Sequence, residues 1–234
     1  GSGPFSVAAA DANGDSKLDI IVANYGSNNV GALLNNGDGT FAAQVTYSTG
    51  SLPRSVAAAD VNGDSKLDII VANQNSNNVG VLLNNGNGIF AAQVTYSTGS
   101  RPYSVAAGDV NGDNKLDIIV ANYGSANIGV LLNNGIGTFA AQVTYSTGSS
   151  PRSVAAADAN GDSKLDIIVI NQNSNNVGVL LNNGDGTFAA QVTYSTGSSP
   201  VSVAAVDGNG DSKLDIIVAN YASNNVGVLL AVCN

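Results

Sequence analysis

The chain has 234 residues, of which 44% are hydrophobic, and its 17 acidic residues outweigh its 8 basic ones to give a net charge of −9. This hydrophobic content is enough to bury a core, so the many Asn, Gly and Ser residues are assigned to turns rather than to disorder. No apolar run approaches the roughly 20 residues that a membrane helix needs, and the chain shows no signal peptide, so we expect no membrane insertion.

Five near-identical repeats account for almost the whole chain. The segment DANGDSKLD begins at Asp11 and returns, slightly varied, at Asp60, Asp109, Asp158 and Asp207, always 49 residues after the previous copy. A strict period of this length indicates a repeat architecture. We therefore predict a single domain made of five repeats, with boundaries at 1–49, 50–98, 99–147, 148–196 and 197–234.

Within one repeat, four short strands are predicted in chain order. In the second copy they cover residues 55–59, 67–72, 79–83 and 92–96, which are apolar or β-branched. The segments between them are rich in Asn, Asp, Gly, Ser and Pro, which favour turns, and no segment suits a helix. A repeat of this length with four strands is typical of a propeller blade. The prediction is an all-β, five-bladed β-propeller of four-stranded antiparallel blades; a parallel β-helix is the rival, but its turns are much shorter.

The last repeat departs from the pattern at its end. After Leu230 the chain continues only with Ala231, Val232, Cys233 and Asn234, so the last blade is predicted to lack its outer strand. An open outer edge invites pairing with another chain, which makes a homo-oligomer through this edge, or a longer array of repeats, a hypothesis. Cys233 is the only cysteine, cannot form an internal disulfide, and is given no role.

The loop between the first two strands of each repeat carries oxygen ligands at alternate positions. In the first copy these are Asp11, Asn13, Asp15, the carbonyl of Lys17, and Asp19. Calcium takes six to eight oxygens, and alternate side chains of a tightly curled loop converge on one point. The sequence therefore predicts about one calcium per repeat. The other predicted ligands are Asp60, Asn62, Asp64, Lys66 and Asp68; Asp109, Asn111, Asp113, Lys115 and Asp117; Asp158, Asn160, Asp162, Lys164 and Asp166; and Asp207, Asn209, Asp211, Lys213 and Asp215.

Charge supports a metal in these loops. All acidic residues are Asp, and only Asp38 and Asp185 lie outside the five loops. Three carboxylates in one short loop repel each other, and a divalent ion relieves that repulsion. Zinc is unsuited because the chain has no His and one Cys, and no open catalytic position is evident, so we expect structural ions. The alternative is that the loop forms only an Asx-rich turn without metal.

This loop pattern resembles the calcium motif DxDxDGxxD of FG-GAP or VCBS repeats, which are found in the integrin α-subunit head and in many secreted or surface propellers. The resemblance covers essentially the whole chain and implies a structural or adhesive propeller located outside the cell or on its surface. Calcium loops of this kind also suit extracellular calcium concentrations. Two features depart from the family: Ser65, or Asn114 in the third copy, stands where glycine is usual, and the best-known relatives have seven blades.

Catalysis and nucleic-acid binding are not expected. The chain contains no His and no Glu, so general acid–base chemistry has few candidate groups. The lysines occur only inside the acidic loops, and Arg54, Arg101 and Arg152 form no basic stripe. We therefore expect a non-enzymatic chain without nucleic-acid partners, an enzyme fragment being the least favoured alternative.

Two columns vary between the copies and are candidates for a ligand site. One reads Tyr25, Gln74, Tyr123, Gln172 and Tyr221, and the other reads Phe5, Arg54, Tyr103, Arg152 and Val201. Exposed tyrosines beside Asn-rich loops can stack on sugars, so a carbohydrate-binding, lectin-like module is the alternative function. Ordinary loop variation is the simpler explanation of both columns. Whether the partner is a protein or a glycan is left open.

Overall fold

Each repeat forms one antiparallel sheet, which we call a blade, and the computed structural model describes residues 1–231. Blade 1 comprises β1 (Pro4–Ala10), β2 (Asp19–Asn24), β3 (Asn29–Leu33) and β4 (Val45–Ser48). Blade 2 comprises β5 (Pro53–Ala59), β6 (Asp68–Asn73), β7 (Asn78–Leu82) and β8 (Val94–Ser97). Blade 3 comprises β9 (Pro102–Gly108), β10 (Asp117–Asn122), β11 (Asn127–Leu131) and β14 (Val143–Ser146). Blade 4 comprises β15 (Pro151–Ala157), β16 (Asp166–Asn171), β17 (Asn176–Leu180) and β18 (Val192–Ser195). Blade 5 comprises β19 (Pro200–Val206), β20 (Asp215–Asn220) and β21 (Asn225–Leu229).

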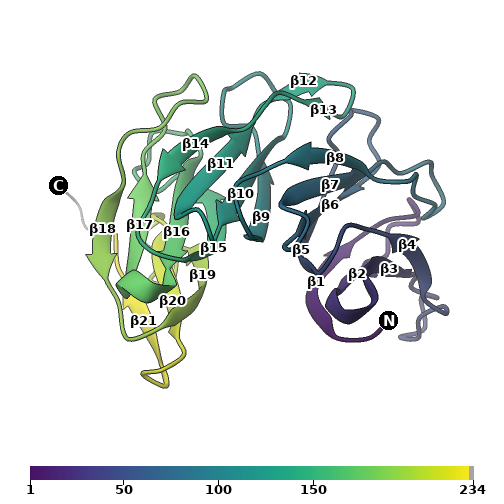
Figure 1. Cartoon of the computed structure of the whole chain (residues 1–234), viewed down its shortest axis with the longest axis horizontal. Coiled ribbons are helices and arrows are strands. Elements are labelled where there is room, and N and C mark those ends of the chain that lie inside the picture. Colours follow the sequence, from purple (N-terminus) through teal and green to yellow (C-terminus); the bar gives the residue numbers. More distant parts are fainter. Residues whose placement is uncertain (232–234) are drawn as a thin grey trace.

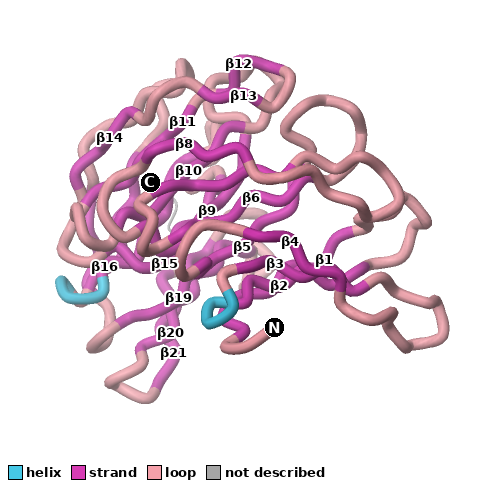
Figure 2. Tube along the Cα trace, turned by 45° about the vertical axis from the view of Figure 1, so that its right-hand side comes forward, coloured by secondary structure: helices cyan, strands magenta, loops and turns pink. Residues whose placement is uncertain are grey.

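The blades stand side by side around a common axis, as Figures 1 and 2 show. Strands within a blade lie in chain order, and the first strand of each blade packs beside the first strand of the next. The predicted β-propeller is thus confirmed. The blades form an arc rather than a closed ring: blade 1 and blade 5 occupy its two ends (Figure 1).

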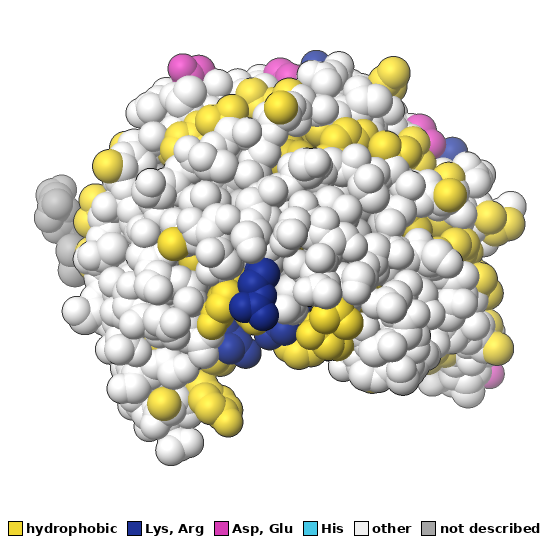
Figure 3. Space-filling model, viewed as in Figure 1, with side chains coloured by type: hydrophobic (Ala, Val, Ile, Leu, Met, Phe, Trp, Pro, Cys, Tyr) yellow, Lys and Arg dark blue, Asp and Glu magenta, His cyan; other side chains and the backbone are white. Residues whose placement is uncertain are grey.

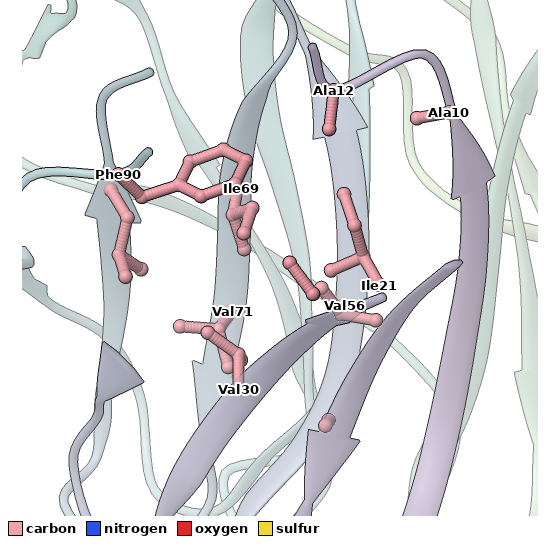
Figure 4. Close-up of a cluster of buried hydrophobic side chains, with 11 residues drawn as sticks. Ala10, Ala12, Ile21, Val30, Val56, Ile69, Val71 and Phe90 are labelled. Atoms are coloured by element: carbon pink, nitrogen blue, oxygen red, sulfur yellow. The ribbon is translucent and has the colours of Figure 1, made fainter. Parts of the chain in front are cut away.

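The core lies between neighbouring blades. At the interface of blades 1 and 2, Ile21 and Val30 pack against Val56, Ile69 and Val71, as Figure 4 shows. The second strands of blades 2, 3 and 4 are fully buried, because their Ile and Val side chains face a neighbouring blade on both sides. Similar clusters fill the other three interfaces.

Several details differ from the sequence-based prediction. Strand ends move by one or two residues, and Phe139 in β13 (Thr138–Phe139) pairs with β12 (Asn133–Gly135) in a small additional hairpin. Two short 3-10 turns, η1 (Tyr25–Ser27) and η2 (Gln172–Ser174), replace plain turns. Blade 5 has three strands within the described part of the chain, as predicted. Cys233 lies outside the described residues.

No helix in residues 1–231 has the length and apolar character needed to cross a bilayer.

Candidate functional site

The antiparallel order gives every blade two distinct ends. In blade 1, Ala10 pairs with Asp19, so the loop 11–18 projects from one end, while Pro4 pairs with Asn24 at the other. The connection from β3 to β4 leaves from the same end as this loop, because Ile20 pairs with Leu33. We call the end with the five loops the aspartate face and the opposite end the arginine face.

Charges separate between these two faces. Every acidic residue belongs to the aspartate face, since Asp38 and Asp185 lie in connections that leave from the same end as the five loops. All three arginines belong to the other face: Arg54 and Arg152 are second in their innermost strands, and Arg101 directly precedes β9. The molecule is acidic overall but cationic at one end.

Each aspartate loop is tied together by its own side chains. In blade 2, Asp60 Oδ1 accepts the N–H of Gly63 at 2.7 Å, and Asp60 Oδ2 accepts the N–H of Ser65 at 2.7 Å. Asn62 Oδ1 accepts the N–H of Asp64 at 3.0 Å. Ser65 adopts a left-handed conformation with φ of 63°, which explains why glycine is usual there in the family motif.

The last aspartate of the loop is buried. Asp68 has no exposed surface, and its two carboxylate oxygens accept the N–H groups of Val61 at 3.0 Å and Asn84 at 2.8 Å. Burial raises the pKa of Asp68; the two hydrogen bonds oppose this rise, and the charges of Asp64 and Asp60 add to it. The same burial and the same two hydrogen bonds from backbone N–H groups recur at Asp19, Asp117, Asp166 and Asp215.

The predicted ligands of each repeat therefore lie together in one loop, but their carboxylates face backbone N–H groups. Asp64 also pairs with the Lys66 ammonium at 2.9 Å. In residues 1–231 no three acidic side chains are close enough to form a ready-made metal cluster. The donor set still fits a hard cation, because every donor is an oxygen and the buried Asp68 carboxylate lies near the carboxylates of Asp60 and Asp64. Asp60, Asn62, Asp64, Asp68 and the carbonyl of Lys66 would hold the ion.

Sequence reasoning missed the asparagine that links neighbouring blades. The amide of Asn84 is buried and donates to the carbonyl of Ala12 in blade 1 at 2.8 Å and to that of Leu67 in its own blade at 3.0 Å. Asn133 and Asn182 repeat both contacts. A signal is present in the sequence, because an asparagine recurs at this position in four of the five repeats, but asparagine in such a segment is also typical of a turn.

The arginine face contains a cavity at the axis of the arc. Its volume is about 300 Å³, and it is lined by two consecutive residues from the innermost strand of each blade. The first of each pair belongs to the variable column Phe5, Arg54, Tyr103, Arg152 and Val201, and the second is always serine. Figure 3 shows a group of basic side chains here beside hydrophobic ones, whereas acidic side chains and the remaining basic ones lie near the rim.

The two variable columns touch each other around this cavity. Arg54 Nη1 donates to Gln74 Oε1 at 3.1 Å, and Arg152 makes the equivalent bond to Gln172 at 3.0 Å. The rings of Tyr103 and Tyr123 stack with centroids 4.1 Å apart. Arginine in one column therefore contacts glutamine in the other, and tyrosine contacts tyrosine. These contacts explain why both columns vary with the same two-repeat period.

This fold and its repeated loops define a β-propeller with an aspartate-rich turn in every blade. The model of the FG-GAP-like repeat matches residues 11–71, 60–120, 109–169 and 158–218, and the chain belongs to this family. No curated protein sequence matches the chain closely enough to count as a relative.

Several solved structures share the fold. A putative 6-phosphogluconolactonase from Bacteroides uniformis aligns over 97% of this chain and 66% of its own, with a TM-score of 0.72 and 18% identity. Virginiamycin B lyase from Staphylococcus aureus aligns over 98% of this chain and 82% of its own, with a TM-score of 0.67 and 14% identity. The biofilm matrix protein Bap1 of V. cholerae aligns over 97% of this chain but only 37% of its own, with a TM-score of 0.55 and 21% identity. At such identities the likeness concerns the fold alone.

Proposed function

We propose that this chain is a calcium-stabilised, non-catalytic propeller that acts as a structural or adhesive binding scaffold at the cell surface or outside the cell. The observation that carries the proposal is the buried carboxylate of each aspartate loop. Asp68 is fully buried beside Asp60 and Asp64, whose charges raise its pKa further. A divalent cation bound by these groups would offset both the burial and the mutual repulsion.

The position of the loops explains why binding would stabilise the fold. Asp68 Oδ2 accepts the N–H of Val61 at the start of the loop, and Oδ1 accepts that of Asn84, whose side chain reaches blade 1. A cation held by this loop would therefore restrain one hairpin and the contact between two blades. Binding to the folded chain alone adds about 2.7 kcal/mol per site when calcium is at 100 times its dissociation constant.

The test is a thermal melt of EDTA-stripped protein before and after calcium addition, with isothermal titration of calcium in parallel. We expect about one ion per repeat and a rise in Tm. Magnesium, which prefers more water ligands, serves as the control cation and should raise Tm less. A melt that calcium leaves unchanged, with no heat of binding, would contradict the proposal and leave the loops as Asx turns.

A carbohydrate-binding function is the second candidate, and the exposed aromatic rings of the arginine face favour it. Tyr221 is 74% exposed, so its ring is free to stack on a sugar. Phe5 is also exposed, but its ring already contacts Tyr25 and the Arg54 guanidinium. Tyr103 is less available, because it already contacts Tyr123 and the Arg54 guanidinium. A glycan array without hits would contradict this function while leaving the calcium proposal intact.

A further inference from the structure

The axial cavity of the arginine face is a concave site with a charge opposite to that of the whole molecule. Two of its lining side chains, Arg54 and Arg152, carry guanidinium groups, and no carboxylate lines it. In the described part of the chain no arginine forms an ion pair; the four Lys–Asp pairs all belong to the opposite face. These two positive charges therefore lack an anionic partner.

The hydrogen bonds of these arginines leave most of their donors available. Each guanidinium has five N–H donors, and the bond to Gln74 or Gln172 uses one of them. Glutamine oxygens are neutral acceptors, so they orient the guanidinium without compensating its charge. A planar group with free donors matches the oxygens of a carboxylate or sulfate in a bidentate manner.

Aromatic rings fix the position of Arg54. Its guanidinium carbon lies 4.2 Å from the ring centre of Phe5 and 3.7 Å from that of Tyr103. Arg54 and Arg152 line the same cavity, so their positive charges repel each other. Burial lowers the pKa of Arg54, and the positive charge of Arg152 also acts to lower it. Such repulsion is relieved by an anion placed between them.

We propose that the axial cavity binds an oxyanion, a carboxylate or sulfate group carried by a small ligand or by an acidic sugar. Arg54 and Arg152 bind the charged oxygens, and the neighbouring serine hydroxyls of Ser55, Ser104 and Ser153 are positioned to donate further hydrogen bonds. Those hydroxyl oxygens already accept one backbone N–H from the next blade, as Ser55 does from Val105 at 3.2 Å, which holds them in place. The site is independent of the calcium loops.

The experiment is a titration of the full chain with sodium sulfate, sodium glucuronate and glucose, followed by NMR or calorimetry at low ionic strength, where charge interactions are least screened. Arg54→Gln and Arg152→Gln remove one guanidinium each. Arg101→Gln is the matched control, because it removes the same charge from the same face outside the cavity. Thermal melts verify that each variant is folded, and calcium titration of each variant tests the proposed function separately.

We expect sulfate or glucuronate to bind the wild-type chain and glucose not to bind. Arg54→Gln and Arg152→Gln should each weaken anion binding at least about tenfold, with less than about twofold loss in Arg101→Gln, and calcium binding should not change. Binding of sulfate alone identifies a free ion as the ligand, and binding of glucuronate alone identifies a carboxylate on a sugar. The proposal is overturned if neither anion binds, if glucose binds as well as glucuronate, or if Arg101→Gln weakens binding as much as the other two.

A second inference rests on the two ends of the arc. Val7 in blade 1 is 65% exposed, whereas the equivalent Val56 is 7% exposed. Val226 in blade 5 is 64% exposed, whereas the equivalent Val30 is fully buried. The uncovered side of the blade 1 sheet, which includes Val7, is called the leading face. The uncovered side of the blade 5 sheet, which includes Val226, is called the trailing face.

These two faces are complementary, because the chain already contains their interface. Val30 on the trailing side of blade 1 packs in one cluster with Val56 on the leading side of blade 2. Val226 and Val7 occupy the corresponding positions of their repeats. We infer that the trailing face of one molecule binds the leading face of a second copy of this chain, in the geometry of one blade on the next.

Sedimentation velocity over a range of concentrations tests this inference. Wild type should associate, while Val7→Asp and Val226→Asp should each be monomeric. When mixed, the two variants should form a 1:1 dimer, because the intact trailing face of Val7→Asp can still bind the intact leading face of Val226→Asp. Val143→Asp, on the exposed outer strand β14, is the control and should associate like wild type. A wild-type monomer at every concentration overturns the inference, as does continued association of Val7→Asp alone, which would indicate pairing through the free edge of β21.

Discussion

The carboxylate of Asp117 accepts a hydrogen bond of 2.8 Å from the backbone N–H of Asn133. Its second oxygen accepts the N–H of Val110 at 3.0 Å. The buried side chain of Asp117 thus joins the start of the aspartate loop to the segment after the third strand, where Asn133 lies 16 residues beyond Asp117. Both bonds of this clamp are made between groups of the protein itself.

Replacing Asp117 by Asn tests the clamp. The amide keeps one acceptor and turns the other oxygen into a donor, which would face a backbone N–H. We expect the free energy of unfolding in EDTA to fall by about 1 to 3 kcal/mol, the usual penalty of an unsatisfied buried group. Urea denaturation measures it. Asp38→Asn is the control, because Asp38 is exposed and should change stability by less than about 0.5 kcal/mol.

The asparagine that crosses between blades supplies a second prediction. Asn133→Ala removes the bonds to the carbonyls of Val61 and Leu116, leaving both without this partner. Asn35→Ala, the equivalent change in blade 1, removes only one donated bond, to the carbonyl of Leu18, because blade 1 is the first blade of the arc. Both changes also remove the bond that the side-chain oxygen accepts from the backbone N–H two residues later. We expect Asn133→Ala to cost about 1 kcal/mol more than Asn35→Ala. Equal losses in urea denaturation would show that the contact between blades adds no stability.

Calcium binding and stability can be separated by a change at an exposed ligand. Asp113 accepts only local bonds, from the N–H and ammonium of Lys115. Asp113→Ala should therefore abolish the ion of blade 3 in a calcium titration, lowering the stoichiometry by one, while the Tm in EDTA stays within about 2 °C of wild type. Asp185→Ala removes the same charge outside the five loops and should keep every ion. An unchanged stoichiometry in Asp113→Ala would contradict the predicted ligand set.

The features that could be predicted from the sequence are those whose interacting residues lie close together along the chain. The strict period and the four apolar segments of each repeat predicted the propeller, because strand pairing inside a blade is local. The aspartate loops were also found, since Asp60 and Asp68 are only eight residues apart. The contact of the Asn84 amide does not follow from the sequence, because its partner Ala12 lies 72 residues away.

The axial cavity shows the same limit. Variation at Arg54 and Arg152 was visible in the sequence, but the pattern could not show that five blades bring these positions to one point. Nor could it show that the Arg54 guanidinium lies between Phe5 and Tyr103, since each comes from a different blade. Curvature of the arc is set by packing between blades, which one repeat does not encode.

A last prediction uses the repeats as controls for each other. Gly108 ends β9, at a position where blade 2 has Ala59, and glycine in a strand costs roughly 0.5 to 1 kcal/mol relative to alanine. A methyl group on Gly108 would lie 2.7 Å from Leu165 Cδ1, the mobile end of a side chain that can rotate. We expect Gly108→Ala to raise the free energy of unfolding by about 0.5 to 1 kcal/mol and Ala59→Gly to lower it by a similar amount. If Gly108→Ala is destabilising in urea denaturation, Leu165 cannot rotate away and the interface of blades 3 and 4 is packed more tightly than that of blades 2 and 3.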